Sequence, residues 1–271
     1  MEFIFIFLLG LFIGSFLNVL VDRLPREESV IRGRSHCEKC KKELVWFDLI
    51  PLFSFLQLGG KCRYCHSRLS LYYPTVELTT GVLFVSTASF VLDNFQFSIY
   101  NLQSIYNLQF AIPLIYYLFI VSSLIVVFFA DLKYGIIPDK IIFPAISISF
   151  LYLILNTSYS ILPHLLSAIG AGLFFLLLSL IKIRKHSAMG LGDVKFAYLM
   201  GLILGFPNIV VSLYIAFLTG AIVGCILILW RKKKLAGASI PFGPFLVLGA
   251  FPALFWGEII FQKAMLTLGL L

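Results

Sequence analysis

The sequence has little charge. Asp, Glu, Lys and Arg together make up 13% of its 271 residues, whereas 60% are hydrophobic. A soluble domain of this size has no need for so much apolar sequence, so the composition excludes an ordinary soluble fold. Runs of about 20 apolar residues cross a bilayer as helices, and this chain contains several. The runs are continuous rather than alternating, which argues against a membrane β-barrel. We therefore expect an all-α polytopic membrane protein.

The first apolar segment, residues 3–21, lacks the basic start and the small-x-small cleavage site of a signal peptide, so we expect a retained helix. The hydropathy pattern predicts about eight transmembrane helices. They cover residues 3–21, 76–92, 112–130, 139–156, 162–181, 194–206, 209–230 and 243–262. The resulting division is a first helix (1–21), a cytosolic loop (22–75) and a seven-helix membrane domain (76–271).

Basic residues are missing from alternate connections. The segments 93–111, 157–161 and 207–208 contain no Lys or Arg, whereas twenty of the twenty-one basic residues lie in the other loops. The positive-inside bias then places the basic loops in the cytosol and both termini outside. Without the short sixth span this alternation would break. The net charge of +8 therefore reports topology, and we expect no nucleic-acid partner.

Cysteines are few, and four of the five lie in the only sizeable polar segment, residues 22–75. Cys37 and Cys40 form one C-x-x-C motif, and after 21 residues Cys62 and Cys65 form a second. Two such motifs at this separation predict a structural four-thiolate zinc site, which would staple a segment too small for a large core. Disulfides are the alternative, but the cytosol keeps thiols reduced.

Three other residues near or outside these motifs have simpler interpretations. His36 and His66 flank the two motifs and could substitute as ligands, but we expect them to be exposed or to support the ligands. Cys225 lies in an apolar run, and we expect a small buried side chain.

Two aspartates stand where basic loops meet apolar segments. Asp131 closes the third span and Asp193 opens the sixth, so both lie at the same membrane depth. Carboxylates at this edge are costly and indicate function. A pair that shares one proton, with a water molecule, is sufficient for aspartic proteolysis. The alternative is structural: Asp193 caps its helix, and Asp131 pairs with Lys133 or Lys195.

Further candidates surround this pair. Gly190 and Gly192 would let backbone or substrate approach and would allow unusual dihedral angles. Asp139 follows Pro138 and is expected to cap the next helix, with a carboxylate metal site involving it as a weaker alternative. Glu77 is either functional or a first-turn carboxylate at a helix start.

Two short motifs suggest close packing. Gly14 and Ser15 indicate a close helix contact, and Asn18 an interhelical hydrogen bond. The segment 241–245, Pro-Phe-Gly-Pro-Phe, predicts a rigid turn into the last helix that could line a substrate groove.

Together these blocks resemble the bacterial type IV prepilin peptidases, which are membrane aspartic proteases of the G-x-G-D class. The resemblance covers nearly the whole chain. It comprises Gly14-Ser15-Phe16-Leu17-Asn18-Val19, Arg23-Leu24-Pro25, the paired C-x-x-C motifs, Tyr73-Pro74-Thr75-Val76-Glu77, Asp131, Ile137-Pro138-Asp139, Gly190-Leu191-Gly192-Asp193-Val194-Lys195 and Pro241-Phe242-Gly243-Pro244-Phe245.

The resemblance implies a specific activity. Such enzymes remove the short basic leader from prepilins and pseudopilins at the cytosolic face of the inner membrane, cutting after a glycine. Many then methylate the new N-terminal amine with S-adenosylmethionine. The family's catalytic pair maps onto Asp131 and Asp193, with Gly190, Gly192 and Lys195 as supporting residues. The chain lacks a glycine-rich nucleotide-binding motif, so the residues of the methyl-donor site are not predicted.

Other functions fit these residues less well. A presenilin-like protease and a preflagellin peptidase are disfavoured by the cysteine loop and the first-helix motif. A transporter, with the aspartates as a cation relay, would be favoured by repeat symmetry and broken helices, and neither is evident. A membrane-anchored zinc-binding interaction module is the remaining alternative.

Overall fold

The computed structural model describes residues 2–94, 108–156, 160–183, 186–187, 189–230, 241–267 and 269. The chain divides into two compact units, Met1–Phe129 and Ala130–Leu271. The boundary falls within one long helix, α4 (Leu108–Tyr134), whose last turn belongs to the second unit. The division at residues 21 and 75 that the sequence suggests stays a prediction.

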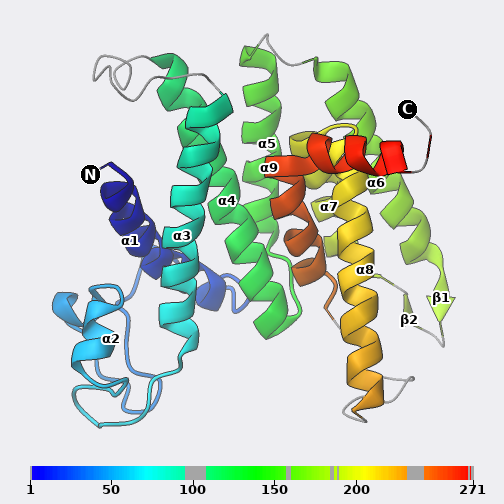
Figure 1. Ribbon diagram of the computed structural model, residues 1–271. Helices are drawn as coiled ribbons and strands as arrows, with labels where there is room; N and C mark the ends of the chain where they lie inside the picture. Colours follow the sequence, from blue (N-terminus) through cyan, green and yellow to red (C-terminus); the bar gives the residue numbers. More distant parts are fainter. Residues whose placement is uncertain are drawn as a thin grey trace. The chain divides into compact units, whose positions relative to one another are not determined.

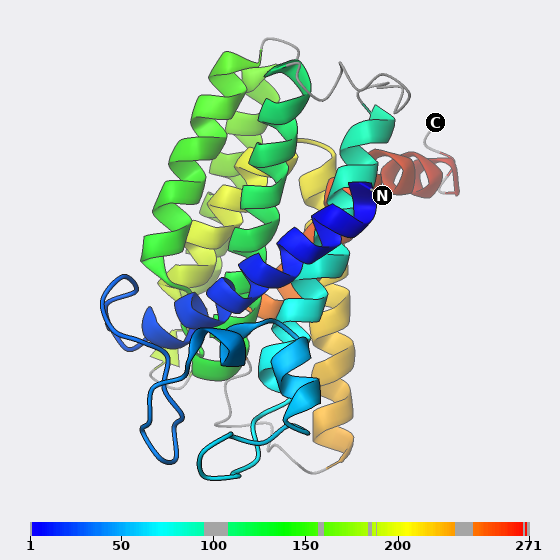
Figure 2. The same ribbon diagram turned by 90° about the vertical axis from the view of Figure 1, so that its left-hand side faces the viewer.

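The first unit is built on two helices in close contact. α1 (Glu2–Arg23) crosses α3 (Tyr72–Asn94) obliquely, as Figure 2 shows. A Cβ atom added at Gly14 would lie 2.7 Å from the Cα of Glu77. Asn18 Nδ2 donates a hydrogen bond of 3.2 Å to the carbonyl of Tyr73. Both the predicted close packing and the predicted interhelical hydrogen bond are therefore confirmed. Small residues permit such an approach where helices pack without a hydrophobic driving force.

Between α1 and α3 lies an extramembrane insert, residues 24–71. It contains a short 3₁₀ helix, η1 (Trp46–Leu49), and one short α-helix, α2 (Phe53–Gln57). The insert lies at the ends of α1 and α3 where Arg23 and Tyr72 are found (Figures 1 and 2).

The second unit contains the remaining helices, α5 (Asp139–Leu155), α6 (Ile161–Leu180), α7 (Leu191–Leu204), α8 (Asn208–Leu229) and α9 (Gly243–Thr267). Two short strands, β1 (Lys182–Ile183) and β2 (His186–Ser187), pair antiparallel between α6 and α7. α7 contacts α5, α6, α8 and α9 (Figure 1), and half of its residues are buried. It is the central helix of this unit.

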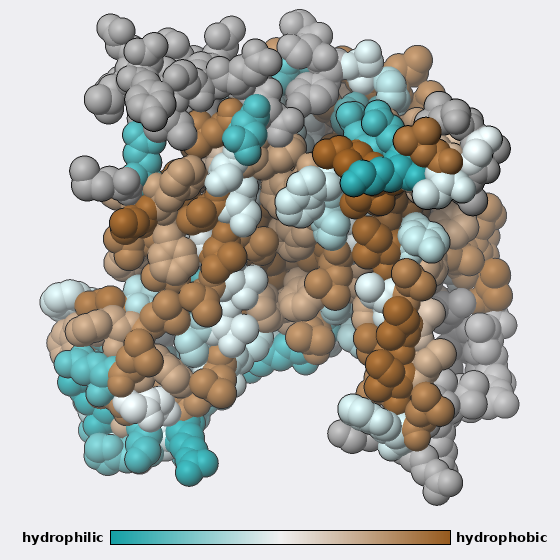
Figure 3. Space-filling view, in the orientation of Figure 1, coloured by the Kyte–Doolittle hydropathy of each residue, from teal (hydrophilic) through white to brown (hydrophobic). Residues whose placement is uncertain are grey.

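Each predicted span contains a helix, but the helices differ in length. Six are long and apolar enough to cross a membrane: α1, α3, α4, α6, α8 and α9. The surface of α8 is largely hydrophobic in Figure 3, as expected for a helix in contact with lipid. α5 has 17 residues and α7 only 14. The fold class of a polytopic helical membrane protein is confirmed, whereas the count of eight spans stays a prediction.

Candidate functional site

Both candidate aspartates belong to the second unit. Asp131 lies near the end of α4 and is buried, with 5% of its surface exposed. Its Oδ2 accepts a hydrogen bond of 2.9 Å from the backbone N–H of Gly243, the first residue of α9. Asp193 lies in the first turn of α7, and its Oδ2 accepts a hydrogen bond of 3.2 Å from the N–H of Gly190. Each carboxylate is thus held by a backbone donor.

The two carboxylates interact electrostatically. Asp193 lies in α7, which is not among the six candidate spans. Desolvation, together with the negative charge of Asp131, raises the pKa of Asp193 to about 6, although the N–H of Gly190 acts in the opposite direction. A carboxyl group with such a pKa keeps its proton over a wider pH range than an ordinary aspartate. The helix-capping contact of Asp193 is present as well, so capping and pairing coexist.

Gly190 and Gly192 matter because they lack side chains, and not because they adopt unusual dihedral angles. Gly190 has an ordinary extended backbone, with φ −75° and ψ 150°, and Gly192 is helical, so that part of the expectation is wrong. A Cβ atom at Gly192 would lie 3.2 Å from the Cβ of Ile137, and one at Gly190 would lie 3.4 Å from Oδ2 of Asp193. The absence of side chains lets the start of α7 approach the segment that follows Asp131.

Gly243 is the residue at this site that sequence reasoning missed. The motif at 241–245 predicted the turn into the last helix, and α9 does begin there. The sequence did not link that turn to Asp131. A Cβ atom at Gly243 would lie 2.6 Å from Oδ2 of Asp131, so only glycine leaves room for the carboxylate to reach the backbone N–H. The glycine next to a proline in this motif was the available signal that the backbone at Gly243 is special.

Lys195 pairs with Asp139 rather than with Asp131. Its Nζ lies 2.8 Å from each carboxylate oxygen of Asp139, which joins the start of α5 to the start of α7. Both side chains are substantially exposed, so the pair contributes about 1 kcal/mol or less. The predicted N-cap role of Asp139 is wrong: Pro138 occupies the cap position, and the carboxylate is turned to Lys195.

Glu77 belongs to the first unit and is 8% exposed. Its Oε2 accepts a hydrogen bond of 2.8 Å from the N–H of Leu52 in the insert. The structural alternative, a carboxylate in the first helical turn, is wrong, because α3 begins at Tyr72 and Glu77 lies in the second turn. The carboxylate instead ties the insert to a membrane-spanning helix.

The four predicted metal ligands form one cluster. Every Sγ atom of Cys37, Cys40, Cys62 and Cys65 lies within 4.8 Å of the others, and no disulfide joins them. Cys37 Sγ and Cys65 Sγ are 3.9 Å apart. Thiolates about 2.3 Å from a tetrahedral zinc ion would lie about 3.8 Å from one another. The cluster therefore fits a metal ion of this size, and the disulfide alternative is wrong.

The two C-x-x-C motifs fold alike. In the first, the N–H of Lys41 donates to the carbonyl of Cys37, and that of Cys37 donates to the carbonyl of Lys42. In the second, His66 and Ser67 play the same parts around Cys62. Lys41 and His66 both have positive φ, 58° and 53°. The matching turns bring the two pairs of thiols together, and His66 is exposed rather than part of the cluster.

Nearby donors prepare two of these thiols to bind metal. The backbone N–H of Cys40 lowers the pKa of Cys37 to about 6, and the hydroxyl of Ser67 lowers the pKa of Cys65. At Cys40 the N–H of Lys42 lowers the pKa, but desolvation and the other three cysteines together raise it to about 11. Four thiolates therefore do not form together without a cation to balance them.

Cys225 is exposed, so its predicted burial is wrong. It lies in α8, within a candidate membrane span. An apolar run in a membrane helix need not face the protein interior, because lipid covers the outward side equally well.

The second unit thus contains two interacting aspartates on a polytopic helical membrane scaffold. Residues 118–225, which include both aspartates, match the Type IV leader peptidase family, and residues 8–91 match the Bacterial Peptidase A24 N-terminal domain. The chain belongs to the prepilin leader peptidase/N-methyltransferase family.

Similar proteins span nearly the whole chain. A "Prepilin leader peptidase/N-methyltransferase" of Bacillus subtilis is 30% identical over 260 residues, covering 94% of both chains. Relatives with the same name occur in Legionella pneumophila, at 31% identity with 93% of this chain and 91% of the relative covered, and in Pseudomonas aeruginosa, at 30% with 93% and 89%. No solved structure gives a significant match.

The cysteine cluster generates the first prediction. Purified protein is expected to contain about one zinc ion per chain, because one four-thiolate site holds one ion. Cys62→Ser should lower that content severalfold, and Cys225→Ser, outside the cluster, should leave it unchanged. Elemental analysis by mass spectrometry measures both. A native protein without metal would contradict the site.

Proposed function

We propose that the protein is an aspartic endopeptidase that removes the basic leader from type IV prepilins or pseudopilins. Asp131 and Asp193 are its catalytic pair. The observation that carries this proposal is that the charge of Asp131 acts on Asp193 within the region that matches the leader peptidases. Family membership argues against the transporter and the simple interaction module.

The proposed reaction needs one carboxylate and one carboxylic acid. The carboxylate takes a proton from a water molecule, whose oxygen attacks the carbonyl carbon of the scissile peptide. The protonated partner donates a hydrogen bond to the carbonyl oxygen as negative charge develops there. The C–N bond then breaks, and the leaving amine receives a proton. Asp193, whose pKa is raised to about 6, is suited to hold the shared proton.

The substrate fits this location. A prepilin is a single transmembrane helix with a basic leader, and its scissile bond lies where that helix begins. Carboxylates at the ends of membrane helices would meet this bond at the edge of the bilayer. We place this face of the protein in the cytosol and both termini outside, as the distribution of basic residues favours in a multi-pass inner-membrane protein.

We further propose that the protein methylates the new N-terminal amine with S-adenosylmethionine. The names of the relatives support this second activity. When bound, this sulfonium donor supplies a methyl group that is transferred to the amine nitrogen. The cysteine cluster would hold structural zinc, because four thiolates leave no open coordination position for a reacting group.

The catalytic pair is tested by single substitutions. Asp131→Asn or Asp193→Asn is expected to lower prepilin cleavage by about 100-fold or more, because each removes a group that transfers or holds a proton. Cleavage is measured with purified enzyme and a prepilin in detergent. Asp139→Asn is the matched control, since it breaks only an exposed ion pair and should retain most activity. Substantial cleavage by either of the first two variants would refute the pair.

Gly243 provides an independent test of geometry. Gly243→Ala should lower kcat on the order of 100-fold, because the new methyl group displaces the Asp131 carboxylate. Gly224→Ala in α8 is the control, since no atom lies within 4 Å of its added Cβ. Equal activity of both variants would show that Gly243 does not position Asp131.

Methylation is tested on substrate that is already cleaved. Wild-type enzyme with S-adenosylmethionine should add one methyl group to the new terminus, detected by mass spectrometry. Asp193→Asn should still do so, because the proposed role of Asp193 is confined to peptide cleavage. If the wild-type enzyme adds no methyl group, the proposed function reduces to the peptidase.

A further inference from the structure

The insert exposes large apolar side chains outside every candidate membrane span. Trp46, Phe53 and Leu56 are 77%, 58% and 76% exposed. Phe53 and Leu56 are three residues apart in α2 and therefore share one side of that helix. Lipid contact of the spanning helices does not account for these residues, since all three lie between α1 and α3.

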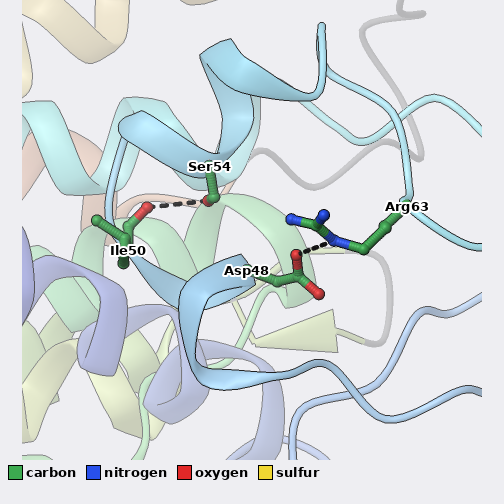
Figure 4. A network of polar contacts seen from close by, with 4 residues as sticks. All are labelled: Asp48, Ile50, Ser54 and Arg63. Atoms are coloured by element: carbon green, nitrogen blue, oxygen red, sulfur yellow. Dashed lines mark hydrogen bonds and ion pairs between the residues drawn. The ribbon is translucent and has the colours of Figure 1, made fainter.

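The segment that carries them is held in place by the cysteine cluster. Arg63, between Cys62 and Cys65, pairs with Asp48 of η1 at 2.7 Å, as Figure 4 shows. The Asp48 side chain is only 3% exposed, and the guanidinium of Arg63 also covers the ring of Phe47 at 4.6 Å. A pair with one buried partner fixes η1 more firmly than a fully exposed pair would.

Two further contacts fix α2. Ser54 Oγ donates to the carbonyl of Ile50 at 2.9 Å (Figure 4), and the N–H of Leu52 donates to the buried carboxylate of Glu77 in α3. Leu52 adopts a positive φ of 57°, an uncommon conformation for a branched residue. The segment 46–56 is thus tied at one end to the cysteine cluster and near its middle to a membrane helix. The exposure of its apolar side chains is imposed by these contacts.

The surroundings indicate what covers this segment. The insert begins after α1 and ends at α3, both candidate spans, so it is confined to the membrane surface. Residues 24–71 contain nine Lys or Arg and five Asp or Glu, a net charge of +4. Hydrophilic side chains gather along the lower edge of the insert at the lower left of Figure 3. Apolar side chains beside cationic ones are typical of segments that lie in an anionic lipid surface.

We propose that residues 46–56 form an interfacial anchor, defined by Trp46, Phe53 and Leu56, that inserts between the headgroups of an anionic leaflet. Tryptophan favours this depth of the bilayer. A basic leader peptide is a poorer occupant, because a positively charged insert repels it. The inference does not depend on the peptidase or the methyltransferase activity. It gives the cysteine cluster a role, which is to hold the anchor at the membrane surface.

Fluorescence of Trp46 tests the anchor in the full-length protein. The variant Trp230→Phe/Trp256→Phe retains only this tryptophan and is placed in phosphatidylcholine nanodiscs with or without phosphatidylglycerol. We expect lipids with brominated chains to quench Trp46 in the anionic discs, and more weakly in the neutral discs or in high salt. The variant Trp46→Phe/Trp230→Phe retains Trp256 in α9, which is expected to be quenched equally in both discs.

Substitutions in the single-tryptophan background test the apolar contacts. Phe53→Ser and Leu56→Ser should each reduce the quenching of Trp46 by brominated lipid, whereas Gln57→Ser, beside them in α2, should not. Quenching of Trp46 by aqueous acrylamide alone, in both kinds of disc, would overturn the anchor. Protection that develops only after a prepilin is added would overturn it too, because the surface would then belong to the substrate.

Discussion

The second unit depends on how a buried carboxylate is satisfied. Asp131 lies at the end of a membrane helix with 5% of its surface exposed, and the N–H of Gly243 is its backbone donor. An ionised carboxylate in such surroundings needs strong donors, since desolvation otherwise costs several kcal/mol. The donor comes from the first residue of α9, where helical N–H groups have no partner within the helix. One contact therefore gives the carboxylate a donor and one N–H group of the helix start an acceptor.

The first unit is stabilised by different contacts. Its helices approach closely at Gly14. Glu77 connects α3 to Leu52 of the insert, and Arg63 connects the second C-x-x-C motif to η1. The insert has only a few buried apolar residues, so its shape depends on the cysteine cluster. The two similar turns around Cys37 and Cys62 form the cysteine cluster of the insert, which is attached to α1 and α3.

The sequence predicted the features that depend on residue type and spacing. Long apolar runs gave the helices, and two C-x-x-C motifs gave the cysteine cluster. The sequence did not predict contacts that depend on a backbone group or on the residue at which a helix begins. The N–H of Gly243 carries no signature in residue type and lies 112 residues from its partner. Shifts in the helix starts misplaced Asp139 and Glu77, because helix boundaries are weakly encoded. Hydropathy could not separate lipid contact from burial at Cys225.

The length of α7 explains how a carboxylate can stand at its start. Fourteen residues span about 21 Å, less than the roughly 30 Å of hydrocarbon, so this helix has ends that lipid cannot satisfy. Within the protein, a side chain contacts the backbone at each end. Asp193 accepts from Gly190 at one end, and at the other His164 Nδ1 donates to the carbonyl of Leu202 at 2.9 Å. Backbone that ends inside a membrane is tolerated only where protein or water meets it. The carboxylate that caps the start of α7 is therefore also the group that we propose for proton transfer.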